Sequence, residues 1–328
     1  MKTLRFWYPQ QKDYAAALAS TLLTPFSCFF KTGTRLRRVF AKPYRSRVPV
    51  ICIGNVVVGG AGKTPTCLAL AKILKKRGHK PCFVTRGYGG KGVSTCVDLA
   101  LHSAEDVGDE ALLLAAAAPT WAGRDRAAAA RQAENYGSLI LMDDGLQNPH
   151  ITKTVSLLVV DGDVGIGNGR VIPAGPLRET FAEALKKIHA MIIIGENDRQ
   201  NLTTRAKVPV FRARLQPDVP RGFPRDSRFV AFAGIARPEK FFATARSLAL
   251  DLAEVCAFPD HYVFSEADID ALRLKAEEQG ARLLTTEKDA ARLPPSFRTE
   301  VIVLPVALVF DDAGAQDALA RLIEERCG

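Results

Sequence analysis

Short uninterrupted apolar runs recur along the first 200 residues, each bounded by glycine or by polar residues. Such runs are typical of strands buried on both faces, because strands with one solvated face alternate apolar and polar residues. Helical stretches separate the runs, as in a parallel sheet that has helices on both faces. We therefore expect an α/β fold with a mainly parallel sheet, whose strands begin at residue 50 and continue at residues 80–86, 138–142, 155–161 and 190–195.

A second α/β set follows residues 208–224, which we predict to hold a strand and a proline-rich linker. This set has expected strands at residues 228–234, 282–286 and 301–305, helices at 238–248 and 266–280, and a loop at 258–264. We place the boundary near residue 222. The predicted organisation is an arm at residues 1–48, a core at 49–222 and a smaller α/β domain at 223–328.

The arm contains an uncharged stretch at residues 14–30, with Pro25 inside it. We expect this stretch to be too short and too broken for a membrane-spanning helix. The densest charges follow it, at residues 35–47, which is the reverse of a secretory signal. Flanking aromatic residues and cations favour a helix that lies in a membrane interface. The alternative is a helix packed on the body, followed by a solvated basic loop.

The formal net charge of the chain is +10, and it is concentrated in the arm. Residues 1–48 contain ten Lys and Arg against the single acid Asp13, so the rest of the chain is nearly neutral. A basic arm on a neutral body argues against a nucleic-acid groove. The seven cysteines form no CxxC pair, so we expect neither a zinc site nor a disulfide framework.

The first strand leads into a glycine-rich loop, and residues 50–65 read VICIGNVVVGGAGKTP. A strand, a loop ending in GKT and a helix (expected at 66–76) indicate a phosphate-binding loop, hence a core of P-loop NTPase type that binds ATP. The lysine can reach the β- and γ-phosphates and the threonine hydroxyl can hold Mg²⁺. The pattern departs from the usual one at Val57, which replaces the first glycine. The predicted nucleotide-binding residues are Gly59, Gly60, Ala61, Gly62, Lys63, Thr64 and Pro65.

Three further acids and one histidine stand in positions that suit catalysis. Asp143 and Asp144 close an apolar strand downstream of the loop, where a carboxylate can complete a Mg²⁺ shell together with Thr64. Paired acids at a strand end are also common turn formers. Asp109 opens a predicted helix, so it is equally a candidate N-cap, and His261 lies in the polar-aromatic loop FPDHYVF, where an incidental role is the alternative.

Seven segments in order resemble the lipid A disaccharide kinase family, the tetraacyldisaccharide 4'-kinases. They are GNVVVGGAGKTP, TRGYGG, VGDE, DDGLQN, GNGRVIPAGPLRE, FPDHYVF and TTEKDAARL. The resemblance implies transfer of the γ-phosphate of ATP, with Mg²⁺, to the 4'-hydroxyl of an acylated glucosamine disaccharide 1-phosphate. It also implies an active site in the cleft between two domains.

The same resemblance implies roles for individual residues. Asp109 would be the base at the acceptor hydroxyl, His261 would partner it across the cleft, and Lys63 would serve ATP. Tyr88, Arg178 and Glu179 fall in family motifs near the site, as possible substrate-binding or supporting residues. We derive no role for residues 285–289 (TTEKD).

The implied substrate carries four acyl chains and stays in a bilayer, so the resemblance places the enzyme peripherally on the cytoplasmic face of the inner membrane. The arm would meet anionic lipid, and its cations at residues 31–47 would meet lipid headgroups and the substrate 1-phosphate. Two rival readings are a membrane-partitioning ATPase, which needs a lysine where this chain has Val58, and a soluble small-molecule kinase.

Overall fold

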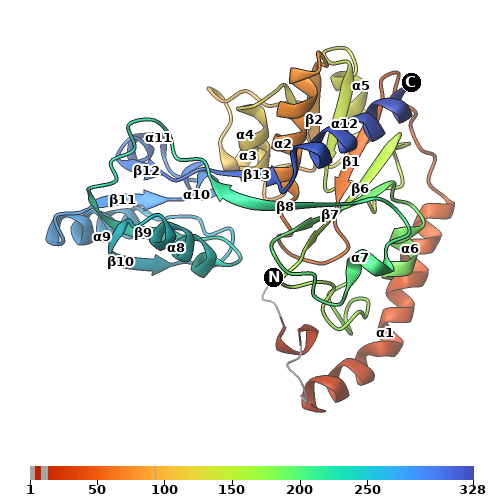
Figure 1. Ribbon diagram of the computed structural model, residues 1–328, viewed down its shortest axis with the longest axis horizontal. Coiled ribbons are helices and arrows are strands. Elements are labelled where there is room, and N and C mark those ends of the chain that lie inside the picture. Colours follow the sequence, from red (N-terminus) through yellow and green to blue (C-terminus); the bar gives the residue numbers. More distant parts are fainter. Residues whose placement is uncertain (1–3, 9–13, 93) are drawn as a thin grey trace.

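The computed structural model describes residues 4–8, 14–92 and 94–328, so Lys2, Lys12 and Asp13 of the arm lie outside the described residues. The described residues form two α/β units, each built on its own sheet (Figure 1).

Within the described ranges, the larger sheet has nine strands. In spatial order they are β13 (Val306–Phe310), β8 (Val210–Pro217), β7 (Ala190–Ile194), β6 (Val155–Asp161), β1 (Val50–Gly54), β5 (Leu139–Asp143), β2 (Pro81–Thr85), β4 (Thr120–Ala122) and β3 (Thr95–Cys96). Neighbours are parallel except at the two edges, where β13 pairs with β8 and β3 with β4 in antiparallel fashion. The expected α/β fold with a mainly parallel sheet is confirmed.

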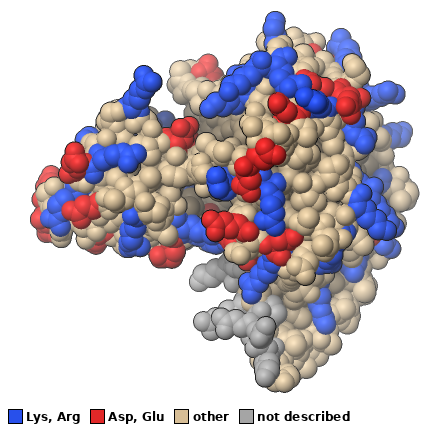
Figure 2. All heavy atoms as spheres, viewed as in Figure 1, with Lys and Arg blue, Asp and Glu red and all other residues tan. Residues whose placement is uncertain are grey.

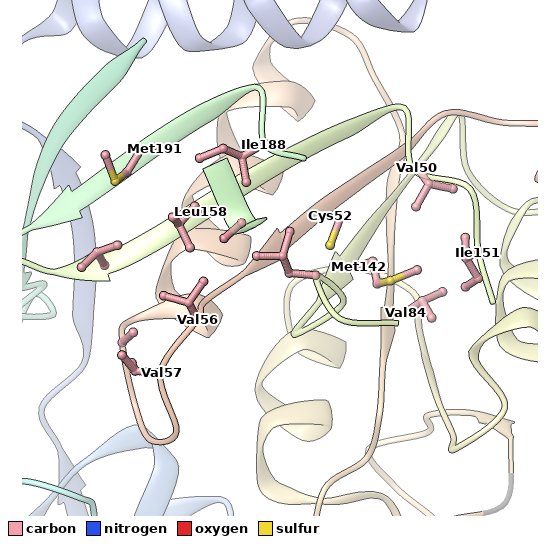
Figure 3. Close-up of a cluster of buried hydrophobic side chains, with 14 of the residues drawn as sticks. Val50, Cys52, Val56, Val57, Val84, Met142, Ile151, Leu158, Ile188 and Met191 are labelled. Carbon is pink, nitrogen blue, oxygen red and sulfur yellow. The ribbon is translucent and has the colours of Figure 1, made fainter. Parts of the chain in front are cut away.

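Helices cover both faces of this sheet, as its doubly buried strands require. One face packs against α2 (Lys63–Lys76), α4 (Asp109–Ala115) and α12 (Ala313–Cys327). The other packs against α5 (Arg126–Ala133), α6 (Phe181–Leu185) and α7 (Leu202–Arg205). Figure 3 shows this second core, where Cys52, Met142 and Leu158 come from three neighbouring strands. The short helix α3 (Ala104–Val107) precedes α4.

The smaller sheet has four strands in the part of the chain that the structure describes, and all are parallel. Their order is β10 (Asp251–Ala257), β9 (Arg228–Ala233), β11 (Arg282–Thr285) and β12 (Val301–Val303). Helices α9 (Glu266–Glu278) and α11 (Pro295–Arg298) pack on one face and α8 (Pro238–Ser247) on the other. The one-turn helix α10 (Glu287–Ala290) follows β11.

The chain does not stay in the smaller unit to its end, which corrects the predicted domain 223–328. Strand β13 crosses back and pairs with β8, and α12 packs beside α2 on the larger sheet. Leu319 and Ile323 of α12 are buried there, so the apolar face of this last helix is satisfied by the core of the larger unit.

The N-terminal arm forms the 3₁₀ turn η1 (Arg5–Trp7) and one long helix, α1 (Tyr14–Val39), that runs along the outside of the larger unit (Figure 1). The helix continues through Pro25, so the expected interruption is wrong, and the basic residues 35–38 are helical rather than in a loop. A proline inside a helix costs about 3 kcal/mol. Contacts on both sides of Pro25 offset that cost, because the Ser20 hydroxyl accepts from Asn168 (2.9 Å) and the Ser27 hydroxyl donates to the Val171 carbonyl (2.7 Å).

Candidate active site

The loop at residues 59–65 lies where β1 ends and α2 begins. Gly59 (φ +116°) and Gly62 (φ +81°) adopt left-handed conformations that favour glycine, and a side chain added at Gly59 or Gly60 would meet only open space. The approach to the loop is anchored, because the Val58 amide donates to the Pro176 carbonyl (2.9 Å) and the Arg178 amide to the Val56 carbonyl (2.7 Å). The loop backbone is therefore held at the carboxyl end of β1, and there is open space beside Gly59 and Gly60.

Asp143 ends β5, next to β1, and its side chain is fully buried. The Thr64 hydroxyl donates to its Oδ2 atom at 3.2 Å, whereas its Oδ1 atom has no hydrogen-bond partner. Burial raises the pKa of Asp143 to about 7, helped by the charge of Glu110. An unpartnered buried carboxylate oxygen is costly unless something binds it.

Asp144 follows Asp143 in a left-handed backbone conformation (φ +50°), and its carboxylate faces two cations. Arg178 Nη1 donates to both of its carboxylate oxygens (2.8 and 2.9 Å), and Lys63 Nζ lies 3.8 Å from Oδ1. Burial raises the pKa of Asp144, but the charges of Lys63 and Arg178 outweigh it and lower the pKa to about 2. Asp144 is therefore ionised at neutral pH, and it holds Lys63 at the start of α2.

These groups fit a magnesium ion. A hydroxyl and an unpartnered carboxylate oxygen meet beside the loop, and hard cations prefer such oxygen ligands. No cluster of three or more His, Cys, Asp or Glu that could hold a metal occurs among the described residues. Mg²⁺ usually takes one or two carboxylates and completes its shell with water and substrate phosphates.

Asp109 and His261 meet across the two units. Asp109 is the first residue of α4 in the larger unit and is 3% exposed, and His261 lies after β10 in the smaller unit at φ +58°. Imidazole Nδ1 is 3.1 Å from Asp109 Oδ2, and the rings of Tyr88 and His261 are 5.4 Å apart. Burial raises the pKa of Asp109, but the hydrogen bond from His261 and the charge of Lys288 outweigh it and leave the pKa below its ordinary value.

Two cations of the TTEKDAARL segment, which has no role predicted from the sequence, also face Asp109. Lys288 Nζ lies 3.9 Å and Arg292 Nε 3.7 Å from Oδ2. Arg292 is held in turn by an ion pair with the buried Asp289. Residues 285–289 thus form part of the surroundings of Asp109, which assigns a location to the TTEKD segment.

Glu179 differs from Tyr88, which contacts the ring of His261. It is buried, and it binds Arg38 of α1 (2.9 Å), Lys187 and the Gln147 amide (3.1 Å). Gln147 also donates to the Asn55 carbonyl at the start of the loop (2.9 Å). Glu179 therefore links α1 to the loop region.

A second set of contacts joins the two units. Arg237, just before α8, forms an ion pair with Asp161 at the end of β6, and Lys240 pairs with Asp163 (2.8 Å). Together with the Asp109–His261 contact, these pairs hold the smaller unit over the carboxyl ends of the larger sheet, where open α/β sheets bind their ligands.

Known proteins resemble the chain over nearly its full length. A curated tetraacyldisaccharide 4'-kinase of Parvibaculum lavamentivorans is 50% identical over 299 residues, 89% of this chain and 87% of the relative. Another, of Rhodospirillum centenum, is 46% identical over 97% of this chain and 96% of the relative. A crystal structure of LpxK from Aquifex aeolicus in complex with ATP is 25% identical, covers 94% of this chain and 99% of that chain, and has a TM-score of 0.74.

The family assignment follows from the extent of these matches. The model of the family described as tetraacyldisaccharide-1-P 4'-kinase matches residues 19–324, which include both units and every site residue named above. The chain belongs to the tetraacyldisaccharide-1-P 4'-kinase family.

Proposed function

We propose that this chain transfers the γ-phosphate of ATP to the 4'-hydroxyl of tetraacyldisaccharide 1-phosphate, a step of lipid A biosynthesis. The observation that carries this proposal is the contact between the buried Asp109 and the partly exposed His261, which joins the two units. Asp109 begins α4, which packs on the same face of the larger sheet as α2, and α2 begins with Lys63 and Thr64. The family assignment supports the choice of substrate.

On the donor side, residues 59–65 act as the phosphate-binding loop. The loop amides and Lys63 bind the phosphates of ATP and neutralise charge that develops during transfer. Thr64 and Asp143 would hold Mg²⁺, with Asp144 nearby, and the ion supplies charge neutralisation and orientation of the phosphates when it is bound. Arg178 keeps Asp144 ionised and fixed beside Lys63.

On the acceptor side, Asp109 is the general base. A sugar hydroxyl is a poor nucleophile, so a carboxylate within hydrogen-bond reach must take its proton as the new bond to phosphorus forms. Its cationic neighbours keep Asp109 ionised and therefore ready to accept a proton. His261 orients the carboxylate through Nδ1, and Tyr88 packs against the imidazole ring. Closure of the two units over bound substrates would exclude water and so suppress hydrolysis of ATP.

We also propose that α1 docks on an anionic bilayer. Its inner face uses small residues (Ala16, Ser20 and Ser27) to pack on the body. Its outer face carries the exposed apolar residues Tyr14, Leu18, Leu22, Phe26 and Phe29, each at least 60% exposed. An ordinary surface helix turns its apolar face to the protein core, whereas α1 turns its apolar face to the outside. None of the helices that the structure describes is long and apolar enough to cross a membrane. Insertion into a bilayer surface would bury the apolar side chains of this stripe.

The cations of the arm divide into two groups. Arg35, Arg38 and Arg47 pair with Glu183, Glu179 and Glu134 of the body, so they are not the free lipid-facing cations that we expected. Lys31, Arg37, Lys42 and Arg45 make no ion pair within the described residues, and we assign attraction to anionic headgroups to these four. The cytoplasmic face of the inner membrane, where such a lipid precursor is made, is the proposed location.

Point variants test the docking surface without disturbing the packing of α1. Phe26→Glu/Phe29→Glu should lower binding to phosphatidylglycerol vesicles about 100-fold, because burial of two phenylalanine side chains contributes about 3 kcal/mol or more. Activity on lipid should fall with it, whereas affinity for ATP should not change. Leu99→Glu/Leu101→Glu, at exposed apolar residues of the body, is the matched control. Equal vesicle binding by both variants would refute this docking surface.

No nucleic-acid partner is proposed. On the face shown in Figure 2, acidic and basic side chains are interspersed, and no broad patch of Lys and Arg runs across it. Nucleic-acid binding relies on neutralisation of phosphates by clustered cations.

The activity is tested by incubating the protein with radiolabelled ATP, Mg²⁺ and tetraacyldisaccharide 1-phosphate in mixed micelles. Label should enter the organic phase, and mass spectrometry should find one added phosphate on the lipid. Release of label only as inorganic phosphate, at a rate independent of the lipid, would overturn the proposal and favour an ATPase.

A further inference from the structure

Both ring nitrogens of His261 have a partner. Nδ1 lies 3.1 Å from Asp109 Oδ2, and Nε2 lies 3.3 Å from Nζ of Lys288. The three groups come from α4, from the loop after β10 and from α10, so the fold brings them together from distant parts of the chain. His261 is thus placed between a carboxylate and an ammonium group.

This arrangement selects one chemical form of the imidazole. An ammonium group can donate hydrogen bonds but cannot accept them, so Nε2 must present its lone pair to Lys288. The single ring proton then sits on Nδ1, where it is donated to the Asp109 carboxylate. A doubly protonated ring would instead direct an N–H group at the ammonium, and the two positive charges would repel each other.

We propose that Lys288 is a positioning residue that keeps His261 neutral and fixes its proton on Nδ1. This inference rests on the proposed function, and it specifies how the Asp109–His261 pair works. Because Lys288 occupies Nε2, that atom is not open to the acceptor hydroxyl. Asp109 is left as the group that takes the proton, and His261 cannot take it further through Nδ1, which already carries one.

Lys288 is itself held in place. Glu110 of α4 contributes a carboxylate oxygen 3.7 Å from Nζ, and the Lys288 side chain is about three-quarters buried. Helix α10 is fixed at its start by Thr286, whose side chain accepts from the Asp289 amide. The amine therefore has a defined position rather than a solvated one.

The other charged groups around the pair do not substitute for Lys288. Arg292 faces Asp109 (3.7 Å), and it is paired with Asp289. Asp289 also accepts from the Gly234 amide (2.9 Å). Tyr88 contributes a ring contact. Lys288 is thus the cation placed at Nε2 among the described residues.

The first test is spectroscopic and needs no substrate. Nitrogen-15 histidine spectra of the full-length protein at pH 7, with His261→Gln for assignment, should show His261 neutral and protonated on Nδ1. Lys288→Met should increase the doubly protonated fraction severalfold, because the repelling charge is gone. Lys275→Met, which removes a lysine that pairs with Glu254 in the same unit, should leave the His261 signals unchanged. An unchanged His261 in Lys288→Met overturns the proposal.

The second test is kinetic. Lys288→Met should lower kcat about tenfold at pH 7, with little change in KM for ATP. An imidazolium hydrogen-bonded to Asp109 at 3.1 Å weakens this base by more than the loss of the Lys288 charge at 3.9 Å strengthens it. The rate should recover as the pH rises, so the acid limb of its kcat profile should move to higher pH by about one unit. Lys288→Arg, which keeps a cation at Nε2, should restore most of the rate. A uniform loss at every pH, or a rise in KM for ATP alone, would overturn the positioning role and indicate a direct phosphate contact.

The two tests separate the two claims. If the wild-type protein transfers no phosphate to the lipid, the proposed function fails, yet the spectra still report whether Lys288 controls the form of His261. If the wild-type protein is active and the spectra of Lys288→Met match those of the wild type, only the role of Lys288 fails.

Discussion

Replacement of Asp109 by asparagine should lower kcat for lipid phosphorylation by at least 10²-fold, and towards 10⁴-fold, with little change in ATP affinity. The size follows from the usual contribution of a general base. Asparagine keeps the shape of the side chain and can still accept from His261, but its amide cannot take a proton from the acceptor hydroxyl. The loss should therefore appear in the chemical step and not in binding.

The measurement is kcat with saturating lipid, alongside ATP affinity by calorimetry. Glu105→Gln is the matched control, because it removes an exposed carboxylate four residues away in the same segment. It should retain full activity. An Asp109→Asn enzyme with near-wild-type kcat would remove Asp109 from the role of base.

Loss of Lys63 should be comparably severe. Lys63→Ala should lower kcat by about 10²–10³-fold, because it removes a preorganised positive charge from the site of phosphoryl transfer. It should also weaken ATP binding, since the lysine reaches the phosphates of the bound nucleotide. The fold should survive, because Asp144 keeps its ion pair with Arg178.

Turnover and ATP affinity should be measured for this variant together with its thermal unfolding. Lys72→Ala, at an exposed position on the same helix, is the control and should behave as the wild type. If Lys63→Ala matches that control in both kcat and ATP affinity, the loop at residues 59–65 does not bind the donor phosphates.

Much of the larger unit could be predicted because its signals are local. Apolar runs identified β1, β5, β6 and β7, and parallel strands place their carboxyl ends at one edge of a sheet. Residues at the carboxyl ends of those strands, such as Asp143 and Asp144, could therefore be expected beside the loop. The Asp109–His261 contact was expected only through the family resemblance, since nothing local links residues so far apart in the sequence.

The errors concern features that depend on distant partners. The return of β13 to the larger sheet is decided by pairing with β8, which no local pattern shows. Pro25 did not end α1 because Asn168 and Val171 bind the helix on either side of it. Arg38 was expected to meet lipid headgroups with the other cations of residues 31–47, but it pairs with the buried Glu179 far along the chain.

Lys288 shows the same limit at the site. The segment TTEKD resembles the family motif, but the role of its lysine could not be predicted from the sequence. The partners of Lys288, His261 and Asp109, come from other elements of the fold. A lysine in a one-turn helix ordinarily reads as a surface residue. The role of Lys288 follows only from the 3.3 Å distance between its Nζ atom and Nε2 of His261.

The central claim is that one site brings a donor phosphate held at residues 59–65 to a lipid hydroxyl held at Asp109. A crystal structure with a non-hydrolysable ATP analogue, Mg²⁺ and tetraacyldisaccharide 1-phosphate measures this directly. The account predicts the γ-phosphate beside Lys63 and the 4'-hydroxyl within about 3.2 Å of an Asp109 carboxylate oxygen. A nucleotide bound elsewhere, or an acceptor hydroxyl out of reach of Asp109, would contradict it.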